Sequence, residues 1–389
     1  MGAPDSGRGL LHTPLGAGRL YARTGDCRLW LFDAQAAMLW DLHANGLNAA
    51  QLTELVAERF GLAPARVRDS IDNQLRQWRQ AGLLDTRPEL ATCANNNPTL
   101  EEATPTSYSL SAAWRLWVAD RAVGLNVADA AIRQRLRPWF PYAATEDCSG
   151  PVDHGLNLSG HARDWRLSRD GQPVAVGHTL DAALLAILTA LTGLACRPAE
   201  CLLIVHGAGL LTPDRRGLLL VAPGGSGKTT LAAALNADGL ALLHDDVVPV
   251  DLHGRLLALG TPMALKAGSW PILASRRPEL ASWPVTQRHD QPVRLLPPLG
   301  QAPRNPVAPA ALLFPGHRPG APLLRERLSA EQALQGLVNS ETVTRDLSQA
   351  KLERLARWVE SVPAWSLTYP DLGQGLAGVR AILADTAPP

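Results

Sequence analysis

The segment from residue 222 to residue 230, APGGSGKTT, has the residue types and the spacing of a loop that binds phosphate groups. Glycines let backbone N–H groups approach phosphate oxygens closely, and a lysine at this position reaches the outer phosphates of a nucleoside triphosphate. The first position of the pattern is Ala222 where glycine is usual, which puts a methyl group into the turn. The residues predicted to bind nucleotide are Gly224, Gly225, Ser226, Gly227, Lys228, Thr229 and Thr230, with the hydroxyl of Thr229 placed to bind Mg²⁺.

The sequence around this loop predicts a strand before it and a helix after it. The apolar run Leu218–Ala222 is typical of a buried strand, and a helix is expected from Thr230 to about Asn236. The first backbone N–H groups of such a helix have no partner within the helix and point toward the loop, where they attract an anion. A glycine-rich helix cap would have a similar composition, but the flanking strand and helix favour phosphate binding.

Two neighbouring carboxylates follow the next predicted strand. Leu240–Leu243 is a short apolar run that ends in His244, Asp245 and Asp246. Ligands of open α/β sheets bind at the carboxyl ends of strands. Two acidic residues beside phosphates indicate that one binds metal while the other accepts a proton from a substrate hydroxyl. The alternative is that Asp245 only caps the turn, since Asp is common there.

Length and composition limit the class of protein. A chain of 389 residues has room for two or three domains, and its formal net charge of +1 gives no global argument for nucleic acid or an anionic membrane. Five cysteines without CxxC spacing indicate a reducing compartment, and we expect a cytoplasmic protein because no secretory signal pattern is present. The longest apolar run, Ala182–Cys196, has 15 residues. A membrane helix needs ~20, so we expect no membrane partner.

Residues 10–86 predict a small α+β domain. Arg19–Arg23 and Cys27–Phe32 are expected to form a hairpin, followed by helices at Ala34–His43, at Ala49–Phe60 with Asn48 as its N-cap, and from Pro64 to near Gly82. A hairpin followed by three helices has the outline of a winged helix. Residues 19–85 contain eight arginines and eight acidic residues, so their charges balance. This balance argues against a DNA-binding surface, which would have a basic excess.

This segment resembles the PqqD-like family, whose members bind leader peptides of ribosomally made precursor peptides. The resemblance covers about residues 19–86 and rests on LFDAQAAMLWDLHANGLNAAQL, RFGL and the long helix that ends in AGLL. It implies that a leader peptide binds to residues 19–86, added as a strand along the edge Cys27–Leu31. It also implies that four residues of the third helix lie either in a peptide-binding groove or in the core: Val67, Ile71, Leu75 and Trp78.

Residues 87–107 predict a linker, because they contain three prolines, Pro88, Pro98 and Pro105, and three successive asparagines without periodicity. The domain expected from 108 to 389 divides into 108–200 and a catalytic part at 201–389. In the first part, strand Trp114–Val118, helix Ala128–Arg137, a hairpin of Trp165–Ser168 with Val174–Val176 and helix Asp181–Leu194 are expected. In the second, strand Leu202–Val205 precedes His206, and helices Ala330–Val338 and Gln349–Val359 are expected to pack against the core.

His206-Gly207, the phosphate loop, and Asp245-Asp246 beginning 17 residues after Lys228 together resemble the HPr kinase/phosphorylase superfamily. The resemblance covers roughly 108–389 and is strongest over 201–270. It implies an α/β P-loop kinase with a central mixed sheet and flanking helices, using ATP and Mg²⁺. Matching position by position, Asp245 would be the general base, Asp246 would join Thr229 on Mg²⁺, and His206 would hold or polarise Asp245.

Two more cations are candidates for contacts with the transferred group. Lys266 stands where the family has a metal-associated Glu and an Arg, so it would stabilise developing charge on the phosphoryl group. The substitution weakens the expectation of phosphorolysis, and a plain surface lysine is the alternative. Arg294 is a further candidate anion contact.

The two resemblances together imply a kinase that phosphorylates a Ser or Thr hydroxyl of a precursor peptide delivered by the N-terminal domain, since tethering raises the local concentration of a poor substrate. One alternative is a kinase for a small metabolite or an HPr-like carrier protein. Another is a P-loop ATPase regulator with a winged-helix DNA-binding module, which the balanced charge of residues 19–85 disfavours, so no nucleic-acid partner is expected. The oligomeric state is left open by the sequence, and a homo-oligomer is compatible with it.

Overall fold

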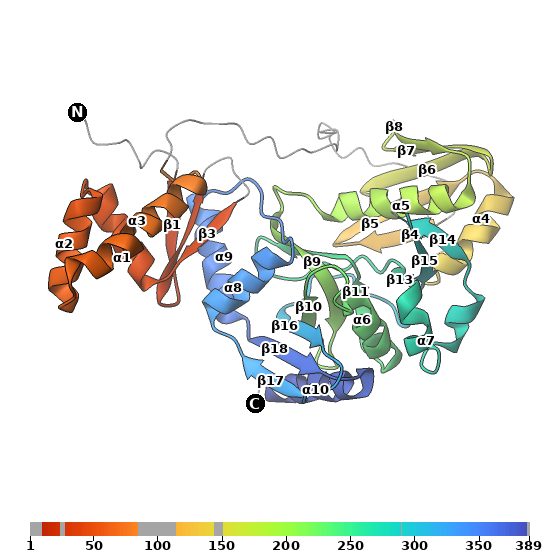
Figure 1. Cartoon of the computed structure of the whole chain (residues 1–389). Coiled ribbons are helices and arrows are strands. Elements are labelled where there is room, and N and C mark those ends of the chain that lie inside the picture. Colours follow the sequence, from red (N-terminus) through yellow and green to blue (C-terminus); the bar gives the residue numbers. More distant parts are fainter. Residues whose placement is uncertain (1–9, 24–27, 85–113, 144–150, 289, 387–389) are drawn as a thin grey trace. The chain divides into compact units, whose positions relative to one another are not determined.

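The computed structural model describes residues 10–23, 28–84, 114–143, 151–288 and 290–386 (Figure 1). It is a mixed α/β protein with several sheets, as expected in general terms. Contacts divide the chain into two units. Arg345–Glu360 groups with the N-terminal residues, whereas 361–389 groups with 99–344, so the division differs from the expected boundaries at one segment. The predicted linker at 87–107 lies outside the described residues.

The first unit contains an antiparallel sheet in the order β1-β2-β3, formed by β1 (Leu10–Leu15), β2 (Gly18–Arg23) and β3 (Leu29–Phe32). Three helices follow, α1 (Ala34–Ala44), α2 (Ala49–Phe60) and α3 (Pro64–Gln80). The three predicted helices and the pairing of the two predicted strands are confirmed. Strand β1 was not expected.

Local sequence signals explain where these helices begin and end. Asn48 accepts a hydrogen bond from the backbone N–H of Gln51, whose side chain accepts one from Asn48 N–H in return, which is a capping box at the start of α2. Helix α2 ends at Gly61, whose φ of 63° lies in the left-handed region that glycine adopts without strain. Asp33 caps α1 through its side chain, which accepts a hydrogen bond from the backbone N–H of Ala36.

An aromatic cluster forms the core between the first sheet and its helices. Phe32 stacks on Trp78 with ring centroids 5.3 Å apart, and Trp40 meets Trp78 edge to face at 5.1 Å. The four α3 residues that were expected in a groove or in the core are at most 5% exposed and belong to this core: Val67, Ile71, Leu75 and Trp78. They are therefore core residues, and the groove interpretation is wrong for them.

Helix α9 (Gln349–Ser361) groups with the first unit, although it was expected to pack against the catalytic core. Near its start Gln349 Nε2 donates to the carbonyl oxygen of His12 at 2.8 Å, and near its end Glu360 Oε1 accepts from Gly16 N–H at 3.0 Å. These two bonds align α9 with β1 over the length of the strand. Long-range pairing of this kind cannot be inferred from the helical periodicity of the segment alone.

The second unit begins with a five-stranded sheet in the order β4-β5-β6-β7-β8. Its elements are β4 (Trp114–Val118), β5 (Arg121–Val127), α4 (Ala130–Leu136), β6 (His154–His161), β7 (Asp164–Arg169), β8 (Gln172–Gly177) and α5 (Leu180–Ala195). The apolar side of α5 packs on this sheet and fills its core. The predicted strand, helices and hairpin of this region are confirmed to within a few residues.

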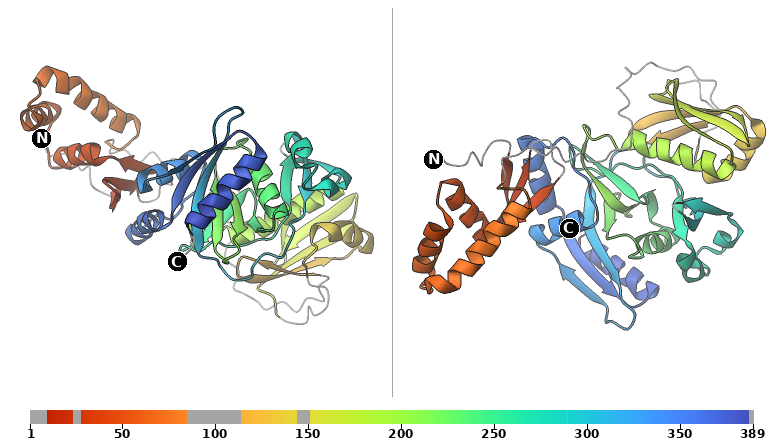
Figure 2. Two further views of the ribbon diagram at one scale, coloured as in Figure 1. Left: turned by 90° about the horizontal axis from the view of Figure 1, so that it is seen from below. Right: turned by 45° about the horizontal axis from the view of Figure 1, so that its top comes forward.

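The central sheet of the second unit has seven strands in the order β11-β9-β10-β16-β18-β17, with β12 also paired to β9. The strands are β9 (Cys201–Leu211), β10 (Gly217–Val221), β11 (Ala241–His244), β12 (Val247–Asp251), β16 (Pro309–His317), β17 (Leu324–Arg327) and β18 (Ala364–Tyr369). Helices α6 (Lys228–Ala237) and α10 (Leu372–Asp385) contact each other and share the apolar core over one face of the sheet (Figure 2). Helix α8 (Ala330–Asn339) matches its prediction.

A small sheet, β13-β15-β14, stands beside the central one. It consists of β13 (Met263–Lys266), β14 (Val285–Arg288) and β15 (Gln291–Leu296), and the short helix α7 (Trp270–Leu273) lies between the first two strands in sequence. Met263, Leu265 and Leu296 are buried in the same core as α6. The small sheet is therefore packed on the helix that follows the phosphate loop.

Strand β9 is longer than predicted, and this changes the position of His206. The strand was expected to end at Val205 but runs to Leu211, so His206 lies within it. Strands β11 and β12 pair with one edge of β9, and β10 pairs with the other. Pairing on both edges keeps Gly207 extended, and a Cβ at this position would lie 2.4 Å from the carbonyl oxygen of Leu220. Tertiary pairing thus overrides the weak strand preference of the glycines.

Candidate functional site

The loop between β10 and α6 has the backbone of an anion cradle. Gly225 and Gly227 have φ values of 79° and 88°, which residues other than glycine adopt only with strain. Helix α6 begins directly afterwards at Lys228, without a side-chain cap on its N–H groups. The hydroxyl oxygen of Ser226 is buried and has no hydrogen-bond partner in the described structure. Free N–H groups and an unpaired buried hydroxyl suit a bound phosphate group.

Lys228 is held beneath this loop. The residue is 7% exposed, and its Nζ donates to the carbonyl oxygens of Ala222 at 2.5 Å and Pro223 at 3.4 Å. Burial lowers the pKa of Lys228 below its ordinary value, and the nearby carboxylates of Asp245 and Asp246 oppose that shift. The ammonium group is thus bound to the backbone of the loop, and the charges of two acidic side chains act on it.

Asp245 is the buried member of the acidic pair. It is 4% exposed, and its Oδ1 accepts a hydrogen bond from the Thr229 hydroxyl at 3.0 Å. Burial, followed by the negative charge of Asp246, raises the pKa of Asp245 to about 6. The first turn of α6 and the end of β11 therefore meet at this hydrogen bond.

Asp246 is the accessible member of the pair. Its side chain is 40% exposed, and its Oδ2 forms an ion pair with Arg288 Nη2 at 2.6 Å. Its φ of 83° is unusual for a residue other than glycine and turns the chain from β11 into β12. Burial opposes its ionisation, but the charge and hydrogen bond of Arg288 outweigh this and hold the pKa of Asp246 below its ordinary range.

The structure changes the expected pairing around the two carboxylates. The resemblance placed Asp246 beside Thr229, whereas the Thr229 hydroxyl bonds to Asp245 and Asp246 bonds to Arg288. The reason is geometric, because the positive φ of Asp246 rotates its side chain away from the direction taken by Asp245. The two acids thus face different surroundings.

Two histidines lie close to the acidic pair. His206 pairs with Val247 in the register of β9 and β12, and the neighbouring Gly207 N–H donates to the Asp246 carbonyl at 3.1 Å. This places His206 beside Asp246, although it was expected beside Asp245. Burial and the charge of Lys228 lower the pKa of His206.

His244, at the end of β11, is buried and hydrogen-bonded through Nδ1 to the Thr261 hydroxyl at 2.8 Å. Burial lowers its pKa to about 4, so it is neutral at pH 7.

The two other predicted catalytic residues, Lys266 and Arg294, lie in different surroundings. Lys266, exposed at the end of β13, is close enough for its charge to lower the pKa of Lys228. The guanidinium of Arg294 stacks on the Trp270 ring at 4.3 Å and donates through Nη1 to the Leu280 carbonyl at 3.1 Å, while its buried Nε has no hydrogen-bond partner among the described residues.

The hydroxyl of Thr230 is hydrogen-bonded to that of Ser269 at 2.7 Å. Arg288 was missed by the sequence analysis, since no spacing pattern links it to a residue 42 positions away.

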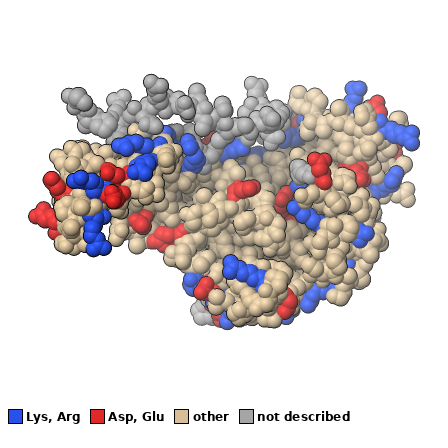
Figure 3. All heavy atoms as spheres, viewed as in Figure 1, with Lys and Arg blue, Asp and Glu red and all other residues tan. Residues whose placement is uncertain are grey.

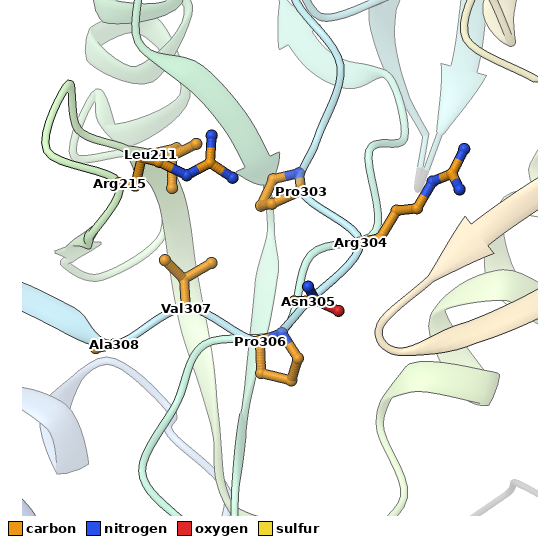
Figure 4. A pocket seen from close by; sticks show the side chains of 8 residues that line it. All are labelled: Leu211, Arg215, Pro303, Arg304, Asn305, Pro306, Val307 and Ala308. Carbon is orange, nitrogen blue, oxygen red and sulfur yellow. The ribbon is translucent and has the colours of Figure 1, made fainter.

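A cavity of about 250 Å³ lies elsewhere in the second unit (Figure 4). It is lined by Leu211, Arg215, Pro303, Arg304, Asn305, Pro306, Val307 and Ala308. Leu211 ends β9, and β10 begins six residues later, so this cavity is at the opposite end of β10 from the phosphate loop. It contains no carboxylate and is separate from the candidate site.

Comparison of the chain with models of known protein families gives no match, and a search of curated proteins finds no similar sequence. Among the residues that the structure describes, no three His, Cys, Asp or Glu side chains gather in a metal-binding arrangement. At the loop the Thr229 hydroxyl and the Asp245 carboxylate are oxygen groups of the kind that bind Mg²⁺. In the same described part of the chain no helix is long and apolar enough to cross a membrane.

Proposed function

We propose that the second unit is an ATP-dependent kinase of the HPr kinase type that phosphorylates a hydroxyl group of a peptide. The observation that carries this proposal is the arrangement of Lys228, Thr229 and Asp245 around the loop that precedes α6. The N-terminal N–H groups of α6, the glycines and Lys228 would hold the phosphates of ATP. Bound Mg²⁺ would neutralise charge on the phosphate oxygens.

We base the proposed roles of Asp245 and Asp246 on how exposed their side chains are. A hydroxyl group on a peptide cannot reach Asp245, which is 4% exposed and occupied by Thr229. We therefore assign Asp245 with Thr229 to the metal and Asp246, whose side chain is 40% exposed, to the acceptor hydroxyl. This exchanges the roles that the resemblance implied for the two residues.

The transfer step follows from this assignment. The acceptor oxygen attacks the γ-phosphorus, its bond to phosphorus forms, the bond between the γ-phosphorus and the bridging oxygen of ADP breaks, and the hydroxyl proton passes to Asp246. Arg288 forms an ion pair with Asp246, and in this proposal its charge would also stabilise the charge that develops on the phosphoryl group. Lys266 is a second cation close to Lys228.

The N-terminal unit supports a peptide as the acceptor. Strand β3 is at one end of the sheet order, and within the described residues it pairs only with β2, so its other edge has backbone groups for an added strand. Of the predicted edge Cys27–Leu31, Cys27 lies outside the described residues. On the face seen in Figure 3, acidic and basic side chains are interspersed over this unit, without a continuous basic surface. A leader peptide bound here suits that surface better than a nucleic acid.

Mass spectrometry of candidate precursor peptides incubated with the full chain, ATP and Mg²⁺ tests this function. We expect the peptide to gain the mass of one or more HPO₃ groups. The variant Lys228→Ala should lose this transfer, whereas Arg215→Ala, at the separate cavity, should retain it. Transfer to a small metabolite without any peptide product would favour the metabolite kinase, and full transfer by Lys228→Ala would contradict the central assignment.

A further inference from the structure

Tyr369 ends β18 at the same edge of the central sheet as the phosphate-binding loop. Strands β10, β16 and β18 are parallel to one another, so their carboxyl ends share one edge. The loop follows β10 there, and the acidic pair follows β11, on the side of β9. Tyr369 is on the opposite side, two strands from β10. Ligands of open α/β sheets bind outside such carboxyl ends, so Tyr369 belongs to the edge where a ligand of the loop would bind.

The hydroxyl group of Tyr369 lies next to the last glycine of the loop. A Cβ atom at Gly227 would be 3.9 Å from the hydroxyl oxygen of Tyr369, and from no other atom of the described residues, adjoining ones aside, would it be within 4 Å. Gly227 directly precedes Lys228, the first residue of α6. The hydroxyl is therefore beside the backbone of the anion cradle without being bonded to it.

Packing fixes the ring of Tyr369, which is 3% exposed. The ring lies against α10 at Gly375, where a Cβ atom would be 2.8 Å from its Cδ2. Glycine is unfavourable inside a helix, and the space that the ring needs explains its presence there. The ring of His317, at the end of β16, has its centroid 5.6 Å away, and His317 Nε2 donates to the Pro370 carbonyl oxygen at 3.1 Å. The direction of the hydroxyl is thus set by the fold before a ligand binds.

The hydroxyl of Tyr369 is a hydrogen-bond donor without an acceptor. It forms no hydrogen bond within the part of the chain that the structure describes, although the side chain is buried. Polar groups of buried side chains normally have a partner. Burial raises the pKa of Tyr369 to about 12, so the hydroxyl keeps its proton at pH 7. A protonated hydroxyl beside backbone N–H groups that suit an anion adds one more donor for that anion.

We propose that Tyr369 is a nucleotide-binding residue, whose hydroxyl donates a hydrogen bond to the phosphate chain held by the loop. The inference rests on the part of the proposed function that assigns ATP to the loop, and not on transfer to a peptide. Lys228 and Thr229 would bind the phosphates on the side of the acidic pair, and Tyr369 would bind them on the side of β18. Its hydroxyl supplies a donor there without a further charge.

The variant Tyr369→Phe tests this assignment, because it removes the hydroxyl and keeps the ring. The hydroxyl has no partner in the free protein, so the midpoint of thermal unfolding without ligand should equal or exceed that of the wild type. Affinity for ATP with Mg²⁺, measured by calorimetry, should fall about tenfold, and affinity for inorganic tripolyphosphate with Mg²⁺ should fall by the same factor. Tyr142→Phe is the matched control. Its hydroxyl accepts a hydrogen bond from Gly300 N–H at 2.7 Å, away from the loop, and both affinities should be those of the wild type.

The outcomes separate this inference from the kinase proposal. Unchanged affinities in Tyr369→Phe would overturn the inference, and so would a loss for ATP alone, which would locate the acceptor on the nucleoside. Weaker binding together with a lower unfolding midpoint would also overturn it, because the hydroxyl would then have a structural partner. If the wild type binds both ligands but phosphorylates no hydroxyl, the kinase proposal fails while the affinities still decide on Tyr369. If the wild type binds neither ligand, both proposals fail.

Discussion

The hydroxyl of Thr229 donates a hydrogen bond to Oδ1 of Asp245 at 3.0 Å, while the neighbouring Asp246 forms its ion pair with Arg288. Two consecutive carboxylates thus belong to two different environments. One is a buried partner of the helix that follows the loop, and the other is an accessible partner of a cation from the small sheet. This separation is the basis for assigning them different tasks.

Substitutions at the two acids should have different effects on binding and transfer. Asp246→Asn should retain binding of ATP with Mg²⁺ and lose at least about 100-fold in kcat, because asparagine tolerates the positive φ but accepts no proton. Asp245→Asn should weaken the dependence of ATP binding on Mg²⁺. Calorimetry of nucleotide binding with and without Mg²⁺, beside steady-state kinetics, measures both effects. The opposite pattern would restore the roles implied by the resemblance.

Removal of Arg288 should shift the pH dependence of transfer. Arg288 holds the pKa of Asp246 below its ordinary range, so the pKa of Asp246 should rise in Arg288→Met. A base must be ionised to accept a proton, and the acidic limb of the kcat/KM profile should therefore move to higher pH. Arg276→Met, which removes an arginine paired with Asp238, is the comparison variant. An unshifted acidic limb in Arg288→Met would argue against Asp246 as the base.

Asp245 should lower the stability of the protein without bound nucleotide or Mg²⁺ as pH rises. Its pKa is about 6 in the folded state against an ordinary value of 3.8, so the folded form holds more protons than the unfolded form between these values. Stability is therefore lost as pH rises from about 4 to about 6. Asp245→Asn should be more stable than the wild type at pH 7, by an amount on the order of 3 kcal/mol, and equal to it near pH 4. Urea unfolding at the two pH values, without nucleotide or Mg²⁺, measures this difference.

Arg277 should contribute strongly to the stability of the second unit. The residue is 2% exposed and its guanidinium donates to Asn236 Oδ1 at 3.2 Å, to the Pro297 carbonyl at 2.9 Å and to Glu279 Oε1 at 2.5 Å. Arg277→Met should cost about 3 kcal/mol, because buried acceptors lose their donors. Arg276→Met, at the neighbouring and more exposed ion pair with Asp238, should cost ~1 kcal/mol or less. Equal costs in urea unfolding would refute this difference.

Local sequence patterns were sufficient for elements whose signals are short in range. The glycine-rich turn before α6, the capping box at Asn48 and the helix Ala49–Phe60 follow from residue types a few positions apart. Strand β1 was missed because Pro14 interrupts its pattern, and an edge strand is where proline is tolerated.

The missed site residues depend on long-range geometry. Arg288 reaches Asp246 from the small sheet. This contact has no fixed spacing in sequence. The partner of Thr229 also could not be inferred, because adjacent aspartates are distinguished only by the backbone turn at Asp246.

Helix α9 makes the N-terminal unit a discontinuous domain. The chain leaves that unit after the first sheet and its helices, builds most of the second unit, and returns to supply α9 before it completes the second unit. Excision of residues 10–86 would yield a fragment without the helix bonded to His12 and Gly16, and deletion of the same residues would leave that helix without these partners. Neither truncation isolates a whole domain. Any ligand that stabilises the N-terminal unit also stabilises α9, whose flanking residues continue directly into Thr344 on one side and into the segment before β18 on the other.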